Sequence, residues 1–318
     1  MFYKDKKILV TGGTGFVGSH IVEELLAAGA FVRVPLHIRP SPIRHERLEL
    51  LPGDLTVLED CRRLARGMDY VFHAGGTVSS AGTTSAAAMS AITLNTVVTA
   101  HTIQAAWEEG AERLLVFSSS TAYPEANHAI KEDEMWSAPP YPGYFGYAWM
   151  RRYTERLCEF AASRSQMKIA LVRPTAVYGR RDTSAHVIPS LVRRALERQN
   201  PFVVWGTGDE VRDFLHVSDL ARGCLLLLEK HAECDPVNIG YGSAVTIRQT
   251  VSAILRAAGH EQAEIVFDAT KPGTIPFRMV DTSKARRLLG FEPKILLEEG
   301  LADTVKWFQA NPRFGTAE

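Results

Sequence analysis

A glycine-rich segment close to the N-terminus places the strongest constraint on the fold of this 318-residue chain. Gly12, Gly15 and Gly18 recur every third residue, after the apolar run Ile8–Val10 and before a stretch with helical periodicity. Glycines at this spacing permit a tight turn and let backbone N–H groups at a helix N-terminus approach a pyrophosphate. The order of strand, glycine turn and helix predicts a nicotinamide-dinucleotide site of the Rossmann type. The expected contacts in this turn are Gly12, Thr14, Gly15, Phe16, Val17 and Gly18.

The rest of the N-terminal half alternates apolar runs with helical patterns. Strands are expected at residues 31–34, 70–73, 114–117 and 169–172, and helices at residues 20–28 and about 90–109. This alternation is typical of an α/β fold with a doubly wound parallel (Rossmann) sheet.

The pattern loosens after Pro174, where loops rich in proline and glycine separate shorter elements. A helix is expected at residues 189–198, a strand at 202–205, and a return to the sheet at 237–239. We therefore expect a Rossmann domain at residues 1–174, with residues 214–240 returning to its sheet. Residues 175–213 and 241–318 are expected to form a smaller, discontinuous α/β domain that binds the substrate.

Composition excludes several classes of partner. The 36 basic side chains balance 36 acidic ones, so no net charge draws the chain to nucleic acid or to an anionic membrane. No apolar run has the length of a membrane span, and no signal peptide is expected before the first strand. The four cysteines lack CxxC or metal-ligand spacing, which predicts reduced thiols in a cytoplasmic protein and no metal site.

The end of the second strand bears on the choice between NADP and NAD. An acidic residue at this position would accept the adenosine ribose hydroxyls of NAD, but the segment Val32–Arg39 contains no carboxylate. His37 and Arg39 follow the strand instead, and cationic groups suit a 2′-phosphate. We therefore expect NADP(H) rather than NAD. The alternative is that both side chains are solvated loop residues.

A second group of residues predicts the chemistry. Ser119 follows a buried strand, and the active sites of open α/β sheets lie at such strand ends. A serine hydroxyl can hold a carbonyl oxygen while a tyrosine, here Tyr147, exchanges a proton with it. Arg151 lies four residues after Tyr147, one helical turn away on the same face, and brings a cation close to it. The alternative is a helix with an exposed arginine pair and a tyrosine that only packs.

With these motifs the chain resembles, over nearly its whole length, the extended short-chain dehydrogenase/reductases of the NAD-dependent epimerase/dehydratase family of nucleotide-sugar enzymes. Within that family it is most similar to the GDP-L-fucose synthases, which use NADPH to epimerise and reduce GDP-4-keto-6-deoxymannose. The matching runs are Ser119–Pro124, His186–Arg194, Val203–Gly208, Arg212–Val217 and Phe267–Gly273.

The resemblance implies a role for each matching position. Asp54 would contact the adenine amino group, and Ser119 and Tyr147 would be catalytic with Arg151 in the place of the family's lysine. His186 would be the acid of the epimerisation. Further cofactor contacts would come from Leu55, Ala74 and Gly75. The nucleotide diphosphate, favoured as a GDP-sugar, would lie against Val187, Leu191, Arg194, Trp205, Arg212 and Arg278.

The chain departs from the family pattern at Arg151 and at Thr121, where the fucose synthases have a cysteine base. A threonine hydroxyl is too weakly acidic to replace that base, which leaves open a 4-keto reductase, a redox-neutral nucleotide-sugar 4-epimerase, or a two-base reaction that uses other groups. A cofactor-binding protein that has lost catalysis is a further alternative. A homodimer is expected through the helix that carries Tyr147, unless its apolar residues belong to the core. Those residues are Trp149, Tyr153, Leu157 and Phe160.

Overall fold

The computed structural model describes residues 2–77, 85–271 and 275–312. Pro272 and Gly273, which end the last of the matching runs, lie outside these residues. No helix in the described part of the chain is long and apolar enough to cross a membrane.

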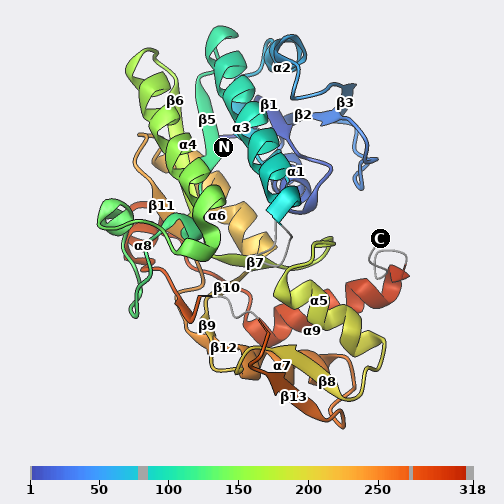
Figure 1. Cartoon of the computed structure of the whole chain (residues 1–318). Coiled ribbons are helices and arrows are strands. Elements are labelled where there is room, and N and C mark those ends of the chain that lie inside the picture. The colour runs from blue at the N-terminus through green and yellow to red at the C-terminus, as the bar shows by residue number, and fades with distance from the viewer. Residues whose placement is uncertain (1, 78–84, 272–274, 313–318) are drawn as a thin grey trace.

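A seven-stranded parallel sheet forms the centre of the larger domain (Figure 1). Its strand order is β11-β6-β5-β4-β1-β2-β3, which confirms the predicted doubly wound topology. The strands are β1 Lys7–Thr11, β2 Phe31–Leu36, β3 Leu48–Pro52, β4 Tyr70–His73, β5 Arg113–Phe117, β6 Lys168–Pro174 and β11 Val237–Ile239. The expected strands at residues 31–34 and 169–172 are therefore each longer by a few residues.

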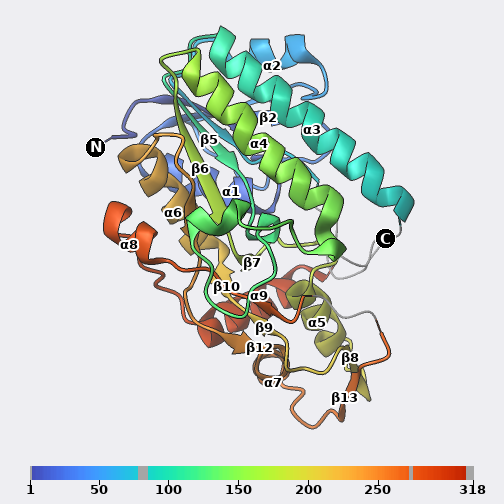
Figure 2. The ribbon, with the colours of Figure 1, turned by 60° about the vertical axis from the view of Figure 1, so that its left-hand side comes forward.

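Helices cover both faces of this sheet. Residues of α1 Phe16–Ala27, α6 Val217–Lys230 and α8 Ser283–Leu289 share one apolar cluster with the sheet. Residues of α2 Leu58–Ala65, α3 Ser85–Glu108 and α4 Phe145–Ser163 pack on the other face, where α3 and α4 lie side by side (Figure 2). Three short 3-10 helices lie between β5 and α4: η1 Ser120–Ala122, η2 Glu132–Trp136 and η3 Pro142–Tyr144.

The smaller domain has its own apolar cluster, built from three helices and a two-stranded sheet (Figure 1). These elements are α5 Val187–Leu196, α7 Ile247–Ala257, α9 Leu297–Ala310, β8 Phe202–Trp205 and β13 Ile265–Asp268. The described residues form two further small sheets. One pairs β7 Ala176–Tyr178 with β10 Phe214–His216, and the other contains β9 Val211–Arg212, β12 Val245–Thr246 and β14 Phe277–Arg278.

The structure divides the chain a little differently from the expected domain boundaries. β10 pairs with β7, so within residues 214–240 only β11 joins the large sheet. Helix α8 lies inside the range expected for the smaller domain, yet Ala285 and Leu289 are buried in the Rossmann core. Helix α1 begins at Phe16, four residues before the predicted start, so Gly18 of the glycine-rich segment lies inside the helix.

Candidate active site

The glycine turn lies where the strand order reverses, between β1 and its neighbour β4. Gly12 has φ +69°, and a Cβ atom there would come within 2.5 Å of the Ala74 carbonyl oxygen. A Cβ atom on Gly18 would come within 2.1 Å of the Gly12 carbonyl oxygen. Both positions therefore require glycine, and the turn packs directly against the segment that follows β4.

The start of α1 fits a dinucleotide pyrophosphate. Gly15 is the N-cap, no side chain caps the helix, and its first turn contains no acidic residue. The first N–H groups of the helix therefore point toward the turn without a side-chain acceptor, and the helix dipole favours an anion there. Thr14, Phe16 and Val17 belong to this same turn and helix start, as the sequence predicted.

Three more of the predicted cofactor residues border the turn. The Gly75 backbone N–H donates to Thr11 Oγ1 at 3.2 Å, which places Gly75 beside the end of β1. A Cβ atom on Gly75 would come within 2.9 Å of Leu55 Cδ1, so these two residues are in contact. Ala74 faces Gly12. The structure therefore brings Leu55, Ala74 and Gly75 together with the glycine turn.

His37 and Arg39 are exposed in the loop after β2, the strand next to β1. His37 Nε2 lies 3.8 Å from Asp54 Oδ2. Asp54 Oδ1 accepts hydrogen bonds from the backbone N–H and the hydroxyl of Thr56, which lower the pKa of Asp54 from its ordinary value. The structure thus groups His37 with Asp54 near the carboxyl ends of β2 and β3. Their contacts with the adenosine part of a cofactor stay a prediction.

The serine loop follows β5 and begins η1. Ser119 Oγ lies 2.8 Å from Thr121 Oγ1 and accepts from the Thr121 backbone N–H at 3.1 Å. Thr121 therefore stands beside Ser119, at the position where the fucose synthase pattern has a cysteine. The two hydroxyls are half-buried, at the edge of the sheet where ligands of open α/β folds bind.

Helix α4 brings Arg151 to the same strand end. Its Nη1 atom donates to the Phe117 carbonyl oxygen at 2.8 Å, at the last residue of β5. The guanidinium carbon lies 4.9 Å from the centroid of the Tyr147 ring. Arg151 Nε is buried and has no hydrogen-bond partner among the described residues. The structure thus brings Tyr147 and Arg151 together as the sequence expected, and their roles toward substrate and cofactor stay a prediction.

Two buried arginines lie side by side in the smaller domain. Arg278 of β14 is the strand partner of Arg212 of β9, and each is less than a tenth exposed. Burial, reinforced by the charge of Arg212, lowers the pKa of Arg278 to about 10. Arg278 Nε has no hydrogen-bond partner among the described residues. Such a pair of cations suits an anionic ligand, because a bound anion would offset the cost of burying both charges.

The remaining predicted substrate residues have different surroundings. His186 is the N-cap of α5, and Val187 and Trp205 are exposed. Leu191 is buried in the core of the smaller domain. The guanidinium of Arg194 donates to Gln199 Oε1 and the Val203 carbonyl oxygen. Two of its five N–H donors therefore bond inside the domain, and a contact from Arg194 to a diphosphate stays a prediction.

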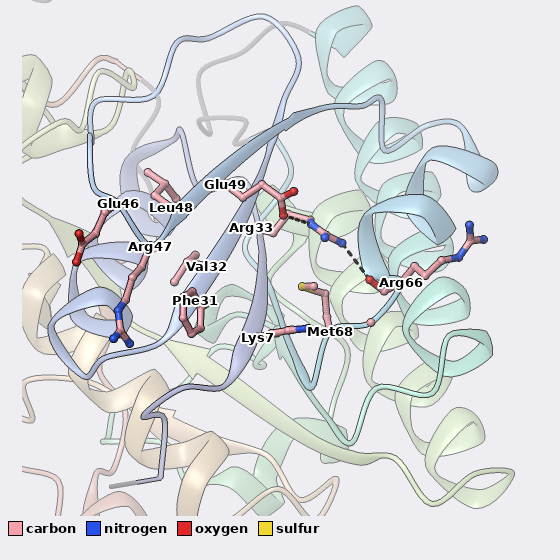
Figure 3. Close-up of a pocket in the computed structure, with 11 residues that line it drawn as sticks. Lys7, Phe31, Val32, Arg33, Glu46, Arg47, Leu48, Glu49, Arg66 and Met68 are labelled. Carbon is pink, nitrogen blue, oxygen red and sulfur yellow. Dashed lines mark hydrogen bonds and ion pairs between the residues drawn. The ribbon is translucent and has the colours of Figure 1, made fainter.

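Two hollows lie at the opposite, amino-terminal edge of the sheet. One, of about 480 Å³, adjoins the starts of β5 and β6. The other, of about 330 Å³, adjoins the starts of β1, β2 and β3 (Figure 3). In it Arg33 donates to Glu49 at 2.6 Å and to the Arg66 carbonyl oxygen at 3.0 Å. Arg33 and Glu49 are thus paired with each other, and neither hollow is lined by a residue that the sequence predicted for the site.

Sequence reasoning did not select Tyr144, Ser118 or Arg173 for the site. The Tyr144 side chain is half-buried. Burial raises the pKa of its hydroxyl, while the nearby charges of Arg212 and Arg278 act to lower it. Ser118 and Arg173 belong to a buried hydrogen-bond network behind the serine loop. The one sequence signal that could have indicated Tyr144 is its spacing, three residues before Tyr147. Arg173 lies in an apolar strand pattern, where a buried charge is unexpected.

Comparison with known proteins places this geometry in a family. The model of the NAD dependent epimerase/dehydratase family matches residues 8–240. GDP-L-fucose synthase 1 from Arabidopsis thaliana is 32% identical over 319 residues, which cover 97% of this chain and 94% of that protein. The dTDP-4-dehydro-6-deoxy-D-allose reductase from Streptomyces bikiniensis is 29% identical, with coverage of 97% and 98%.

A similar solved structure is UDP-glucuronic acid 4-epimerase from Bacillus cereus in complex with UDP-glucuronic acid and NAD. Its TM-score is 0.85 at 25% identity, covering 96% of this chain and 99% of that one. The glycine turn at the switch point, the serine loop after β5 and the Tyr147–Arg151 pair on α4 agree with the family match. This chain belongs to the NAD dependent epimerase/dehydratase family and is an enzyme of the extended short-chain dehydrogenase/reductase type.

Proposed function

We propose that this enzyme reduces the 4-keto group of a nucleotide-diphosphate deoxysugar, with a GDP-sugar as the favoured substrate and NADP(H) as the cofactor. The observation that carries the proposal is the arrangement at the end of β5, where Ser119 and Thr121 adjoin the strand residue held by Arg151. Tyr147 lies against that same cation. The GDP preference follows the sequence relatives, among them the Arabidopsis GDP-L-fucose synthase.

The cofactor would lie across the carboxyl ends of β1 and β4, with its pyrophosphate at the start of α1. NADP is favoured over NAD because β2 ends without a carboxylate and is followed by the exposed His37 and Arg39. The Bacillus epimerase is in complex with NAD. The test below therefore compares NADPH and NADH directly.

The residues of this chain supply proton transfer and orientation. When bound, NADP(H) supplies the hydride for C4 of the sugar. The Tyr147 hydroxyl gives its proton to the C4 oxygen, and Ser119 Oγ hydrogen-bonds the same oxygen. The fixed charge of Arg151 stabilises the phenolate that remains on Tyr147. Arg212 and Arg278 would hold the diphosphate, with Trp205 available to stack on the base.

Thr121 is the reason that we expect reduction without epimerisation. Epimerisation next to the ketone requires a base that removes a proton from carbon, and a threonine hydroxyl is a poor base near neutral pH. His186 alone would provide an acid without its partner base. We therefore expect reduction at C4 without inversion at C3 and C5, the reaction type suggested by the name of the allose reductase relative.

The test combines the purified enzyme with GDP-4-keto-6-deoxymannose and either NADPH or NADH in deuterated water. We expect one NADPH to be consumed per sugar, slower use of NADH, and no deuterium at C3 or C5 by NMR. UDP- and dTDP-linked 4-keto sugars, run in parallel, measure the preference for the base. Thr121→Cys is the matched variant, because it restores the family's base and should introduce deuterium next to the ketone.

The second candidate function is a redox-neutral 4-epimerase, favoured by the structural similarity to the UDP-glucuronic acid 4-epimerase. That enzyme type would interconvert nucleotide hexoses with only catalytic amounts of cofactor, and no net oxidation of NADPH would be seen. Cofactor binding without turnover of any keto sugar or hexose would instead indicate lost catalysis, and would contradict both activities.

We also propose a homodimer formed through α4. Trp149, Tyr153 and Phe160 are 40–61% exposed, which removes them from the core of one chain and leaves an apolar face. The cytoplasm remains the expected compartment, since all four cysteine thiols are free.

A further inference from the structure

Helix α4 is tied to the serine loop at three points that bracket Ser119 and Thr121. The ties are Arg151 Nη1 to the Phe117 carbonyl oxygen at 2.8 Å, Ser118 Oγ to Glu155 Oε1 at 2.5 Å, and Arg152 Nε to the Ala122 carbonyl oxygen at 2.9 Å. The loop is thus attached to the helix immediately before Ser119 and immediately after Thr121. Tyr147 belongs to the same helix, so these ties also set the position of the serine relative to the tyrosine.

The middle tie uses a buried carboxylate that cannot easily move. Glu155 accepts from Arg173 through both oxygens, at 2.8 Å from Nε and 2.7 Å from Nη2. The two side chains are 3% exposed or less. Arg173 lies on β6, next to β5 in the sheet. Because a bidentate pair of this kind fixes the orientation of both groups, the carboxylate that accepts the hydrogen bond from Ser118 Oγ is held against the sheet.

The network continues to the far end of the serine loop. Arg173 Nη1 donates to the Tyr123 hydroxyl oxygen at 2.8 Å, and that hydroxyl donates to Asn238 Oδ1 at 2.7 Å. The loop beyond Tyr123 supplies the Pro124 carbonyl oxygen to Arg278 at 3.0 Å. The same rigid group therefore supports the catalytic serine and contacts one of the arginines proposed to hold the diphosphate.

We infer that Ser118 and Glu155 are positioning residues, which fix the Ser119 hydroxyl relative to Tyr147 and Arg151 for proton transfer. This inference rests on the proposed function. Neither residue needs to touch the substrate, since both act through the loop backbone. Tyr147, Arg151 and Glu155 recur every four residues along one face of α4. The contact of Glu155 with Ser118 therefore fixes the position of the serine loop along the same helix that carries Tyr147.

Ser118→Ala is the sharpest test, because it removes one hydrogen bond and leaves the buried ion pair intact. Loss of a hydrogen bond to a charged group corresponds to roughly a ten- to hundredfold effect. We expect the single-turnover rate of reduction to fall by that factor, while KM for the sugar and Kd for NADPH change less than about twofold. Ser118→Thr keeps the hydroxyl and should restore most of the rate.

Two further measurements separate positioning from general damage. Ser252→Ala removes an exposed serine whose hydroxyl donates to the Arg248 carbonyl oxygen of the same helix, α7, and it should leave rate and stability unchanged. Amide hydrogen exchange over residues 117–124 should be faster in Ser118→Ala than in wild type, and normal in Ser118→Thr. Exchange at wild-type level in Ser118→Ala contradicts the inference even if the wild-type enzyme reduces no sugar. An unchanged rate in Ser118→Ala contradicts it as well. So does a rise in KM for the sugar and in Kd for NADPH that parallels the fall in rate.

Discussion

Arginines of equal charge have different surroundings in this protein, and those surroundings decide what each can do. Arg194 uses its donors on a backbone carbonyl and a glutamine of its own domain. Arg278 is buried next to a second buried arginine, and its Nε atom has no partner among the residues that the structure describes. Arg151 donates from Nη1 to a carbonyl oxygen of β5, while its Nε atom likewise finds no partner in the described part of the chain. The residue type predicts the charge, whereas the contacts determine whether that charge is available to a ligand.

The substitution of arginine for the family's lysine at residue 151 leads to a prediction. Because the Arg151 charge lies 4.9 Å from the Tyr147 ring, Arg151→Lys should keep the reduction rate within about tenfold, whereas Arg151→Met should lose more than that. Tyr147→Phe should cost about a hundred- to ten-thousand-fold in rate, with little change in NADPH affinity. Steady-state kinetics and cofactor titration measure both quantities.

Arg156→Met is the matched control, because Arg156 lies on the exposed side of the same helix and pairs with Glu159. It should not change the rate. Full activity in Tyr147→Phe would contradict the assignment of this site.

At the scale of elements, a buried histidine connects three of them. His73 ends β4, and its ring nitrogens lie 2.8 Å from Thr11 Oγ1 on β1 and 3.0 Å from Thr99 Oγ1 on α3. Burial lowers the pKa of His73 from 6.5 to about 3, with a further contribution from the charge of Arg151. The imidazole therefore remains neutral in the folded protein, and it joins the switch-point strands to the helix that covers them.

This neutral histidine predicts a pH dependence of stability. Below about pH 6.5 the unfolded chain binds a proton on His73, whereas the folded protein does so only near pH 3. The unfolded state then binds more protons, so the free energy of unfolding falls as the pH decreases, by up to about 1.4 kcal/mol per pH unit. His73→Gln should show a shallower slope between pH 6.5 and 4 in urea unfolding. Equal slopes in the two proteins would mean that His73 is charged in the folded state.

For the whole molecule, the open question is whether two copies associate through the apolar face of α4. Light scattering at micromolar concentration should give twice the mass of one chain. Phe160→Asp places a charge on that face, where Phe160 is 61% exposed, and should produce monomers that still bind NADPH. Val57→Asp is the control at an exposed position elsewhere, the N-cap of α2, where an acidic residue is favourable. A wild-type protein of single-chain mass would exclude this dimer.

Local sequence determined the Rossmann sheet and the glycine turn, because apolar periodicity and glycine spacing act over a few neighbouring residues. The order of Ser119, Tyr147 and Arg151 likewise predicted which elements meet at the end of β5. It did not predict that Arg151 binds the Phe117 carbonyl, since that contact depends on how α4 packs against the sheet.

Only the tertiary structure placed α8 in the Rossmann core, paired Arg212 with Arg278, and assembled Ser118, Glu155 and Arg173 behind the serine loop. Ser118, Glu155 and Arg173 are far apart in sequence. Glu155 follows the four-residue spacing of Tyr147 and Arg151, but that spacing does not indicate its partners on the serine loop and on β6. Burying a charged side chain costs free energy unless partner groups pair with it and hydrogen-bond to it, and here those partners come from different elements. Which polar residues are buried together was therefore decided by packing of the whole chain.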